Sequence, residues 1–338
     1  MKERDDALRL LMSAMRGGLP EDSRWLEVVD IANRGWLVPA LYLALERNDC
    51  LSRIRDEVRD YLALIHDRNR ERNRRLRAQL IDTLRALNAT GVQPVLLKGA
   101  ITLFSGEETE WRSRMMSDLD IHIEADDMPA ARAALTKIGY RETDSAHNLA
   151  RPDDAGVLSL HGLPNARSRP YLSGKPETWA PLVERDEVTA RVPTPTARAL
   201  HLLVHDMIKE GDYWRLRINL RHLHDLALLS DAIDWNGVAS ALRDPAGRGS
   251  LALQLLALRE LFGVDVPPPL SGGGVHKLRH RARLRAASKG PAASIARLIG
   301  RLSWGYRRFR ESYSWRGAGD FTSRVRHNLA APPKGSTL

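Results

Sequence analysis

The sequence predicts an α+β protein in which a small sheet lies between two helical parts. Three observations support this: apolar residues repeat at helical spacing over residues 1–90, short apolar runs alternate with helical stretches over 91–165, and helical spacing returns from residue 196. Residues 164–195 are rich in proline and show no sustained period, which indicates an ordered excursion or a loose connector. A chain of 338 residues that is 43% hydrophobic can bury a sizeable core, in two domains or in several packed layers.

The N-terminal part is expected to end in one long helix that packs on the sheet. Its apolar stripe runs from Ile54 to Leu87, shortly before Gly91 and the first predicted strand. Six arginines from Arg68 to Arg77 crowd the middle of this helix. They form either a solvated face, as charged runs on helices usually do, or a surface that meets phosphates or an acceptor.

The first predicted strand ends in a lysine and a glycine, an arrangement that suits phosphate binding. Val95, Leu96 and Leu97 are the buried strand, and Lys98 and Gly99 follow it directly. The lysine supplies a cation, and the glycine, which has no Cβ, lets a bound phosphate approach the backbone closely.

The second predicted strand carries two carboxylates on one face. Because strand side chains alternate between faces, Asp118 and Asp120 point the same way with Cα atoms roughly 7 Å apart, whereas Leu119, Ile121 and Ile123 face the core. Two carboxylates together with triphosphate oxygens commonly hold Mg²⁺ in phosphoryl and nucleotidyl transfer. A solvated strand end is the alternative interpretation of the pair.

In this order and spacing, the two segments resemble the uncharacterised nucleotidyltransferase family of the DNA polymerase beta nucleotidyltransferase superfamily. The resemblance is carried by Leu96-Leu97-Lys98-Gly99-Ala100, by Arg112 and Arg114, and by Ser117-Asp118-Leu119-Asp120. It extends more weakly over about residues 20–265. It implies a nucleotidyltransferase-fold core, with a small mixed sheet covered by helices, flanked by N-terminal and C-terminal helical segments.

The resemblance also implies roles for individual residues. Asp118 and Asp120 are expected to be catalytic and to bind the metal ion. The residues expected to contact the nucleotide come from the strand end, the run-in to the second strand and the later helical part, where polar groups close over the nucleotide. They are Lys98, Gly99, Ala100, Arg112, Arg114, Ser117 and His205.

The third carboxylate is where the sequence departs from the family pattern. Superfamily members generally add an acid from a neighbouring strand, but Leu158–His161 places Ser159 at that position. A hydroxyl cannot supply the charge that deprotonates an acceptor or binds a second metal ion. Glu124 falls on the same strand face as the aspartate pair and is the substitute expected as a metal ligand, and Asp153 and Asp154 are further candidates.

These observations predict a Mg²⁺-dependent nucleotidyltransferase-like enzyme. It is expected to transfer a nucleoside monophosphate from an NTP, in the first place ATP, to a hydroxyl or phosphate of a small molecule, peptide or protein. The competing hypothesis is a catalytically impaired nucleotide-binding core that serves as an RNA- or protein-binding module. Incubation with α-labelled NTPs and Mg²⁺ distinguishes the two.

Four segments are expected along the chain: an N-terminal helical segment that packs on the core (1–90), the nucleotidyltransferase core (91–195), a helical domain (196–270) and a basic tail with an amphipathic helix (271–338). Cys50 is the single cysteine, so an intramolecular disulfide is excluded. The sequence begins without the apolar run of a signal peptide and has no apolar stretch of membrane-spanning length. A cytoplasmic protein that is not integral to the membrane is therefore expected.

The net charge of +10 belongs to the C-terminal tail. Residues 276–338 contain 15 Lys or Arg against 2 acids, so they can recruit an anionic partner such as RNA, an acidic peptide or a lipid surface. Aromatic residues between Trp304 and Trp315 interleave with arginines, a composition typical of nucleic-acid stacking surfaces. An amphipathic helix that docks on the body is the favoured interpretation, and its apolar residues are Ile295, Leu298, Ile299, Leu302 and Phe309.

Overall fold

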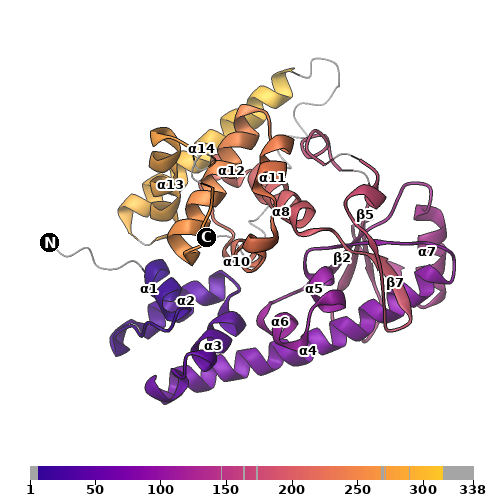
Figure 1. The fold of residues 1–338 in the computed structure, drawn as a ribbon, viewed down its shortest axis with the longest axis horizontal. Coiled ribbons are helices and arrows are strands. Elements are labelled where there is room, and N and C mark those ends of the chain that lie inside the picture. Colours follow the sequence, from indigo (N-terminus) through magenta and orange to yellow (C-terminus); the bar gives the residue numbers. More distant parts are fainter. Residues whose placement is uncertain are drawn as a thin grey trace.

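The computed structural model describes residues 7–314, except 146, 163, 173, 268, 269, 271 and 289, and describes no side chains for 310–314. Figure 1 shows helices gathered on one side of the molecule and a sheet on the other, with one long helix running beneath both. This arrangement confirms the predicted α+β class. Tyr313, Trp315 and the basic residues beyond residue 314 belong to the predicted tail and lie outside the described residues or side chains.

The sheet has seven strands in the order β3-β4-β5-β2-β1-β7-β6. Its central strand β2 pairs antiparallel with β1 and parallel with β5. The strands are β1 Val95–Leu97, β2 Asp118–His122, β3 Arg141–Glu142, β4 Asn148–Ala150, β5 Val157–His161, β6 Leu182–Arg185 and β7 Val188–Arg191. Both predicted strands of the candidate site are thus neighbours at the middle of a mixed sheet.

The proline-rich segment of residues 164–195 contributes two strands, β6 and β7, that the sequence pattern does not predict. β6 and β7 form a hairpin, and β7 extends the sheet by pairing with β1 through Val95 and Arg191. The turn between them places Asp186 and Glu187 at φ +51° and +62°. Hairpin turns of this kind require positive φ at both central residues, and their usual sequences are Asn-Gly and Asp-Gly. Asp-Glu is not one of these sequences, so the turn could not be predicted.

The helices fall before, within and after the sheet region. They are α1 Ala7–Ala14, α2 Trp25–Arg34, α3 Val38–Arg47, α4 Asp56–Asn88, α5 Gly99–Ser105, α6 Glu108–Ser113, α7 Met128–Lys137, α8 Pro195–Leu203, α9 Asp212–Arg215, α10 Leu220–Leu229, α11 Trp235–Ala241, α12 Pro245–Ala257, α13 Gly274–Ala287 and α14 Pro291–Ser314. Two π-helical segments, η4 Val204–Lys209 and η6 Leu258–Phe262, continue α8 and α12. Short 3₁₀ turns are η1 Asp22–Arg24, η2 Leu51–Arg53, η3 Pro176–Thr178 and η5 Ser230–Ala232.

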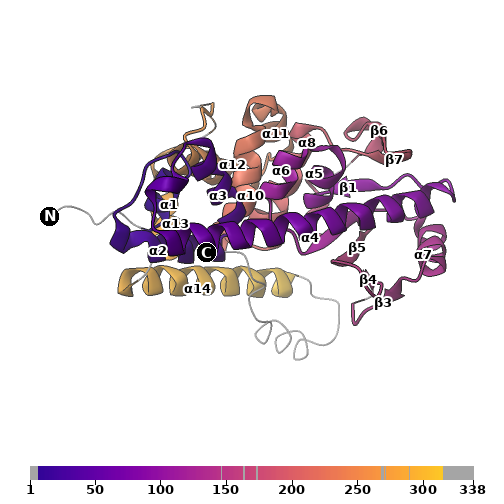
Figure 2. The ribbon, with the colours of Figure 1, turned by 90° about the horizontal axis from the view of Figure 1, so that it is seen from below.

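Two large hydrophobic cores divide the molecule, and α4 belongs to both. Val58 and Leu62 in its first half join a helical core built from residues 8–62 and 199–266, together with Ala287. From Leu76 to Leu87 its second half packs on the sheet with α5 and α7. Figure 2 shows α4 running along the helical half and then the sheet half.

This grouping differs from the predicted segment boundaries. The first helices pack on the helical domain of residues 199–266, whereas only the C-terminal half of α4 packs on the sheet, as expected for the long helix. An amphipathic stripe predicts that a helix buries one face. It does not predict which element covers that face, because this depends on contacts between residues distant in sequence.

The C-terminal helices dock on the helical half through faces other than the predicted one. Arg283 on α13 is 1% exposed and donates hydrogen bonds to the backbone oxygens of Arg217 and Leu253. On α14, Gly300 lies against the backbone of Arg215, where a Cβ would sit 2.2 Å from the carbonyl oxygen.

The small residues of α14 make this close approach possible, so its large apolar residues remain outside. The residues predicted to dock are all more than half exposed: Ile295, Leu298, Ile299, Leu302 and Phe309. The prediction of a docked helix is confirmed, but the prediction of its buried face is wrong. Within the described residues, no helix combines the length and the apolar character that crossing a membrane requires.

Candidate functional site

The site lies on the face of the sheet opposite the core around α4. Strands β1 and β2 pair so that Leu97 lies beside Asp120, which brings Lys98, at the end of β1, to the start of β2. Leu119 and Ile121 are fully buried on the core face, and the two-residue alternation sends Asp118 and Asp120 to the other face. The shared face predicted for the two carboxylates is therefore present.

Asp120 is a buried carboxylate held by two donors. Lys98 Nζ lies 3.1 Å from its Oδ1, and His161 Nε2, on the neighbouring strand β5, donates to the same oxygen at 2.6 Å. Burial alone would raise the pKa of Asp120, but the hydrogen bond from His161 and the charge of Lys98 outweigh burial and lower it below its usual value. Asp120 is thus ionised at neutral pH, and Oδ2 is the oxygen that its two donors leave for a cation.

The backbone turn after β1 is strained and tightly packed. Lys98 has φ +48° and ψ −120°, a conformation that L-residues with a side chain rarely adopt and that tends to persist at functional sites. Gly99 follows without a Cβ, and an added Cβ would meet Met116 Sδ at 2.4 Å and Arg114 Nη1 at 2.5 Å. The close contacts of this turn therefore require glycine at position 99, whereas Lys98 keeps its side chain despite a strained backbone.

Ser159 occupies the place expected for a third acid. The register of β2 with β5 places Ser159 directly beside Asp120. Its hydroxyl lies 3.0 Å from Asn148 Oδ1, to which it donates. The neighbouring strand therefore presents a hydroxyl and the imidazole of His161 to the site where the family pattern has a carboxylate.

Some predicted residues lie with the aspartate pair and others do not. The Ser117 hydroxyl donates to Asp118 Oδ1 at 3.0 Å. Glu124 follows β2 at its opposite end, about 13 Å of strand beyond Asp120 at 3.3 Å per residue, and it accepts a hydrogen bond from His122 Nε2. The structure therefore does not bring Glu124 to the aspartate pair.

Three further predicted residues are held by neighbours within the fold: Arg112, Ala100 and Asp154. Arg112 on α6 forms an ion pair with Glu46 of α3 at 3.7 Å. The side chain of Ala100 is fully buried in the core, so only its backbone can serve a ligand. Asp154, a candidate third acid, is paired with Arg151 at 2.8 Å.

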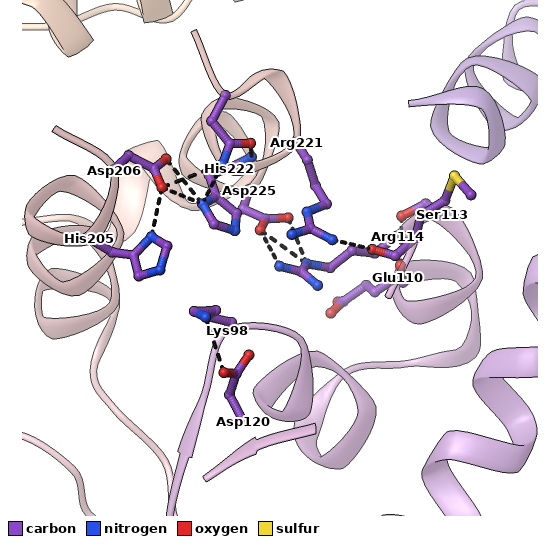
Figure 3. A network of polar contacts seen from close by, with 12 residues as sticks. Lys98, Glu110, Ser113, Arg114, Asp120, His205, Asp206, Arg221, His222 and Asp225 are labelled. Carbon is purple, nitrogen blue, oxygen red and sulfur yellow. Dashed lines mark hydrogen bonds and ion pairs between the residues drawn. The ribbon is translucent and has the colours of Figure 1, made fainter. Parts of the chain in front are cut away.

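Arg114 joins the sheet half to the helical half. Its guanidinium donates hydrogen bonds to both carboxylate oxygens of Asp225 on α10 at 2.8–3.0 Å, and both side chains are largely buried. Next to this pair, Arg221 donates to the backbone oxygen of Met115 at 3.0 Å. Figure 3 shows these groups beside Lys98 and Asp120. In the structure, Arg114 thus joins two parts of the fold at the edge of the site, and its triphosphate contact stays a prediction.

A polar cluster on the helical half faces the same region. Asp206, in the π-helical segment η4, lies 2.9 Å from the Nδ1 atoms of both His205 and His222. Asn219 Nδ2 lies 3.4 Å from the same carboxylate. One ligand atom from each of His205, Asp206 and His222 lies within 4.8 Å of the others, which is close enough to hold a metal ion. Only His205 of this cluster was predicted, since the chain separates Asp206 from His222 by 16 residues.

A pocket opens next to Lys98, between the sheet and α8. Burial lowers the pKa of His201, which lines it, well below the ordinary value, so this imidazole is neutral. Other lining residues are Thr102, Trp179, Pro193, Arg198 and Asp225. The pocket therefore combines cations, a neutral imidazole and apolar surface, and Lys98, which lines it, also contacts Asp120.

Near this cluster, Asp212 gives a pH dependence that can be tested. It is 1% exposed, and burial together with the charge of Asp206 raises its pKa to about 7. Since an unfolded Asp has a pKa of about 4, the folded protein holds a proton that the unfolded chain releases, and stability falls as pH rises from about 4 to about 7.

We therefore expect Asp212→Asn to flatten this decline. Because Asn carries no charge to bury, the variant should exceed the wild type in free energy of unfolding by about 2–4 kcal/mol at pH 8 and by little at pH 4. Urea unfolding at the two pH values measures this, with the exposed Asp231→Asn as control. A variant less stable than the wild type at pH 8 would contradict the expectation.

The fold and the site define a class of protein: a mixed sheet with an Asp-x-Asp strand beside a Lys-Gly turn is the arrangement of a nucleotidyltransferase. Comparison with known families agrees, since the model of the family described as uncharacterised nucleotidyltransferase matches residues 21–263. The chain belongs to this family. No curated protein matches the chain.

Proposed function

We propose that the protein transfers a nucleoside monophosphate from an NTP, with ATP as the first candidate, to an acceptor hydroxyl or phosphate. The observation that carries this proposal is the meeting of Lys98 with Asp118 and Asp120 at one end of β1 and β2. A cation beside two same-face carboxylates suits a triphosphate and its metal ion, and the family membership supports the same chemistry.

The donor set fits Mg²⁺. Carboxylate oxygens are the hard ligands that this ion prefers, and Oδ2 of Asp120 faces away from the two groups that bind Oδ1. When bound there, Mg²⁺ would neutralise the charge that develops on the phosphates. His161 fixes the orientation of Asp120, and Lys98 is placed to exchange its contact with Asp120 for a contact with the triphosphate.

We place part of the nucleotide against the residues that line the small pocket beside Lys98. Trp179 and Pro193 supply apolar surface that a base or a sugar can contact, and Arg198 supplies a second cation. The acceptor is a small molecule, a peptide or a protein. Incubating the purified protein with α-labelled NTPs and Mg²⁺, alone and with lysate, tests the proposal through transfer of label and release of pyrophosphate.

The absence of transfer from every NTP would reject the enzyme and favour the competing proposal of a nucleotide-binding module for RNA or protein. The specific observation behind that alternative is Ser159, which lies beside Asp120 where an acid is expected. Retained binding of ATP and Mg²⁺ without turnover would identify it.

We expect Lys98→Met to weaken ATP binding by about 10- to 100-fold, because it removes the cation nearest the aspartate pair, a charge-assisted contact of about 1.5–3 kcal/mol. Isothermal titration with ATP and Mg²⁺ measures the loss. Lys137→Met on α7, whose lysine is exposed, is the matched control and should bind as the wild type does. Equal affinity of both variants would contradict a triphosphate role for Lys98.

A further inference from the structure

We propose that His205, oriented by Asp206, is the general base that takes the proton of the acceptor. This inference rests on the proposed function and adds the group that receives the proton. It also changes the role predicted for His205, from a nucleotide contact to a catalytic residue that touches the acceptor.

The first argument is position. His205 lies in η4, directly after the turn of α8 that lines the pocket through His201. Figure 3 shows its imidazole extending toward Lys98, with Asp120 beyond it, and the charge of Lys98 acts on the ring. η4 is a π-helical segment, a distortion that is rare and occurs often at functional sites.

The second argument is orientation. His205 bonds to Asp206 through Nδ1 at 2.9 Å, so the proton of the neutral ring sits on Nδ1 and Nε2 carries the lone pair. Asp206 is itself fixed, because His222 and Asn219 bind the same carboxylate and it is only 2% exposed. A carboxylate held in this way sets the tautomer of the ring and stabilises the imidazolium that forms during transfer.

The third argument is protonation. Burial lowers the pKa of His205 first, and the nearby charge of Lys98 lowers it further, against the opposing effect of Asp206. The assignment of Nε2 as the accepting atom rests on the hydrogen bond that Nδ1 makes to Asp206.

The fourth argument is the lack of an acid at the expected place. The neighbouring strand presents Ser159, whose hydroxyl donates to Asn148, and His161, whose Nε2 donates to Asp120. Neither can receive a proton through these atoms, whereas Nε2 of His205 can.

The step balances without another reagent. The acceptor oxygen forms a bond to the α-phosphorus, and the bond from the α-phosphorus to the oxygen bridging to the β-phosphate breaks. Pyrophosphate leaves with that electron pair, and the acceptor proton passes to Nε2 of His205, which later releases it to water.

The experiment compares His205→Gln and His205→Ala with the wild type, using α-labelled ATP, Mg²⁺ and the acceptor found in the transfer assay, or water if hydrolysis is the activity found. We expect the rate to fall about 100- to 1,000-fold while the Kd for ATP stays within twofold, as loss of a general base predicts. Added imidazole should restore part of the rate of His205→Ala. The exposed His147→Gln should behave as the wild type.

Asp206→Asn tests the positioning role through the pH profile. Loss of the negative charge destabilises the imidazolium, so the acid limb of kcat/KM should move to lower pH and the rate should fall. Asp206→Glu should recover part of both. A merely structural role for Asp206 would change the rate without moving the limb, and this result would overturn its assignment as a positioning residue.

The remaining outcomes are separable. If His205→Gln loses ATP affinity as strongly as rate, or if its rate equals that of the wild type while Asp118→Asn is inactive, the inference is rejected and the proposed function stands. A wild type that consumes no NTP rejects both.

Discussion

Asp120→Asn is expected to abolish NTP consumption and also to destabilise the protein, whereas Asp118→Asn is expected to abolish consumption alone. Each variant removes a metal-ligand charge, and losses of about 1,000-fold are typical when one group that stabilises developing charge is removed. The two differ in surroundings, since Asp120 is 4% exposed and binds Lys98 and His161, while Asp118 is partly exposed at the strand end. Leaving the partly buried Lys98 without its counter-charge should cost about 3 kcal/mol of unfolding free energy.

The contribution of Asp120 to stability should also depend on pH. Because its pKa is lowered in the folded protein, the stabilisation is present above the pKa of an unfolded Asp and is lost as pH falls through the folded value. Urea unfolding at pH 7 and in acid should therefore show the gap between the wild type and Asp120→Asn closing at low pH. The exposed Asp126→Asn is the control. Turnover that survives in both site variants would disprove the metal-binding role.

The shared face of Asp118 and Asp120 could be predicted from the sequence, because side chains along a strand alternate between the two faces with a period of two residues. The apolar positions around Asp118 and Asp120 fix which face the carboxylates occupy, and the structure agrees. The meeting of that strand with Lys98 came from the resemblance to the family, since neither strand alone specifies its partner. The position of Ser159 beside Asp120 followed in the same way.

The polar cluster of His205, Asp206 and His222 could not be predicted from strand alternation or from any other local pattern. Asp206 and His222 come from η4 and α10, and only tertiary packing brings them together beside the end of β1. The π-helical turn that carries His205 has no sequence signal, because hydrogen bonds with i→i+5 spacing depend on the surrounding fold. The sequence pattern does not predict the ion pair of Arg114 with Asp225 either, because the two residues are 111 positions apart.

The faces of the C-terminal helices show a different limit. Ile295 and Leu298 have the spacing of a buried stripe, yet Gly300 and Trp304 make the contact with the body. Hydrophobic periodicity identifies the most apolar face of a helix. Close helix packing is also favoured by small residues such as Gly300, because they let two backbones approach each other. The sequence therefore predicted a docked helix correctly and its orientation incorrectly.

Arg114→Leu is expected to destabilise the protein by about 3–5 kcal/mol, because it removes the guanidinium that pairs directly with the buried carboxylate of Asp225 between the two halves of the molecule. The guanidinium of Arg114 also packs against Gly99, so the loss acts where the sheet, α10 and the candidate site meet. Asp225→Leu should have a similar cost for the converse reason. The double variant should recover part of the loss, since two apolar side chains leave no buried charge unpaired.

A double-mutant cycle by urea unfolding at pH 7 measures this coupling. Arg70→Leu is the matched control, because Arg70 also pairs with an acid, Glu108 at 2.8 Å, but both side chains are about half exposed. An exposed pair contributes about 0–1 kcal/mol, so the control should cost little. If Arg114→Leu cost no more than Arg70→Leu, the ion pair would not hold the sheet and helical halves together. A large cost that the double variant partly recovers would instead identify the Arg114–Asp225 pair as an interaction that holds the sheet half and the helical half together.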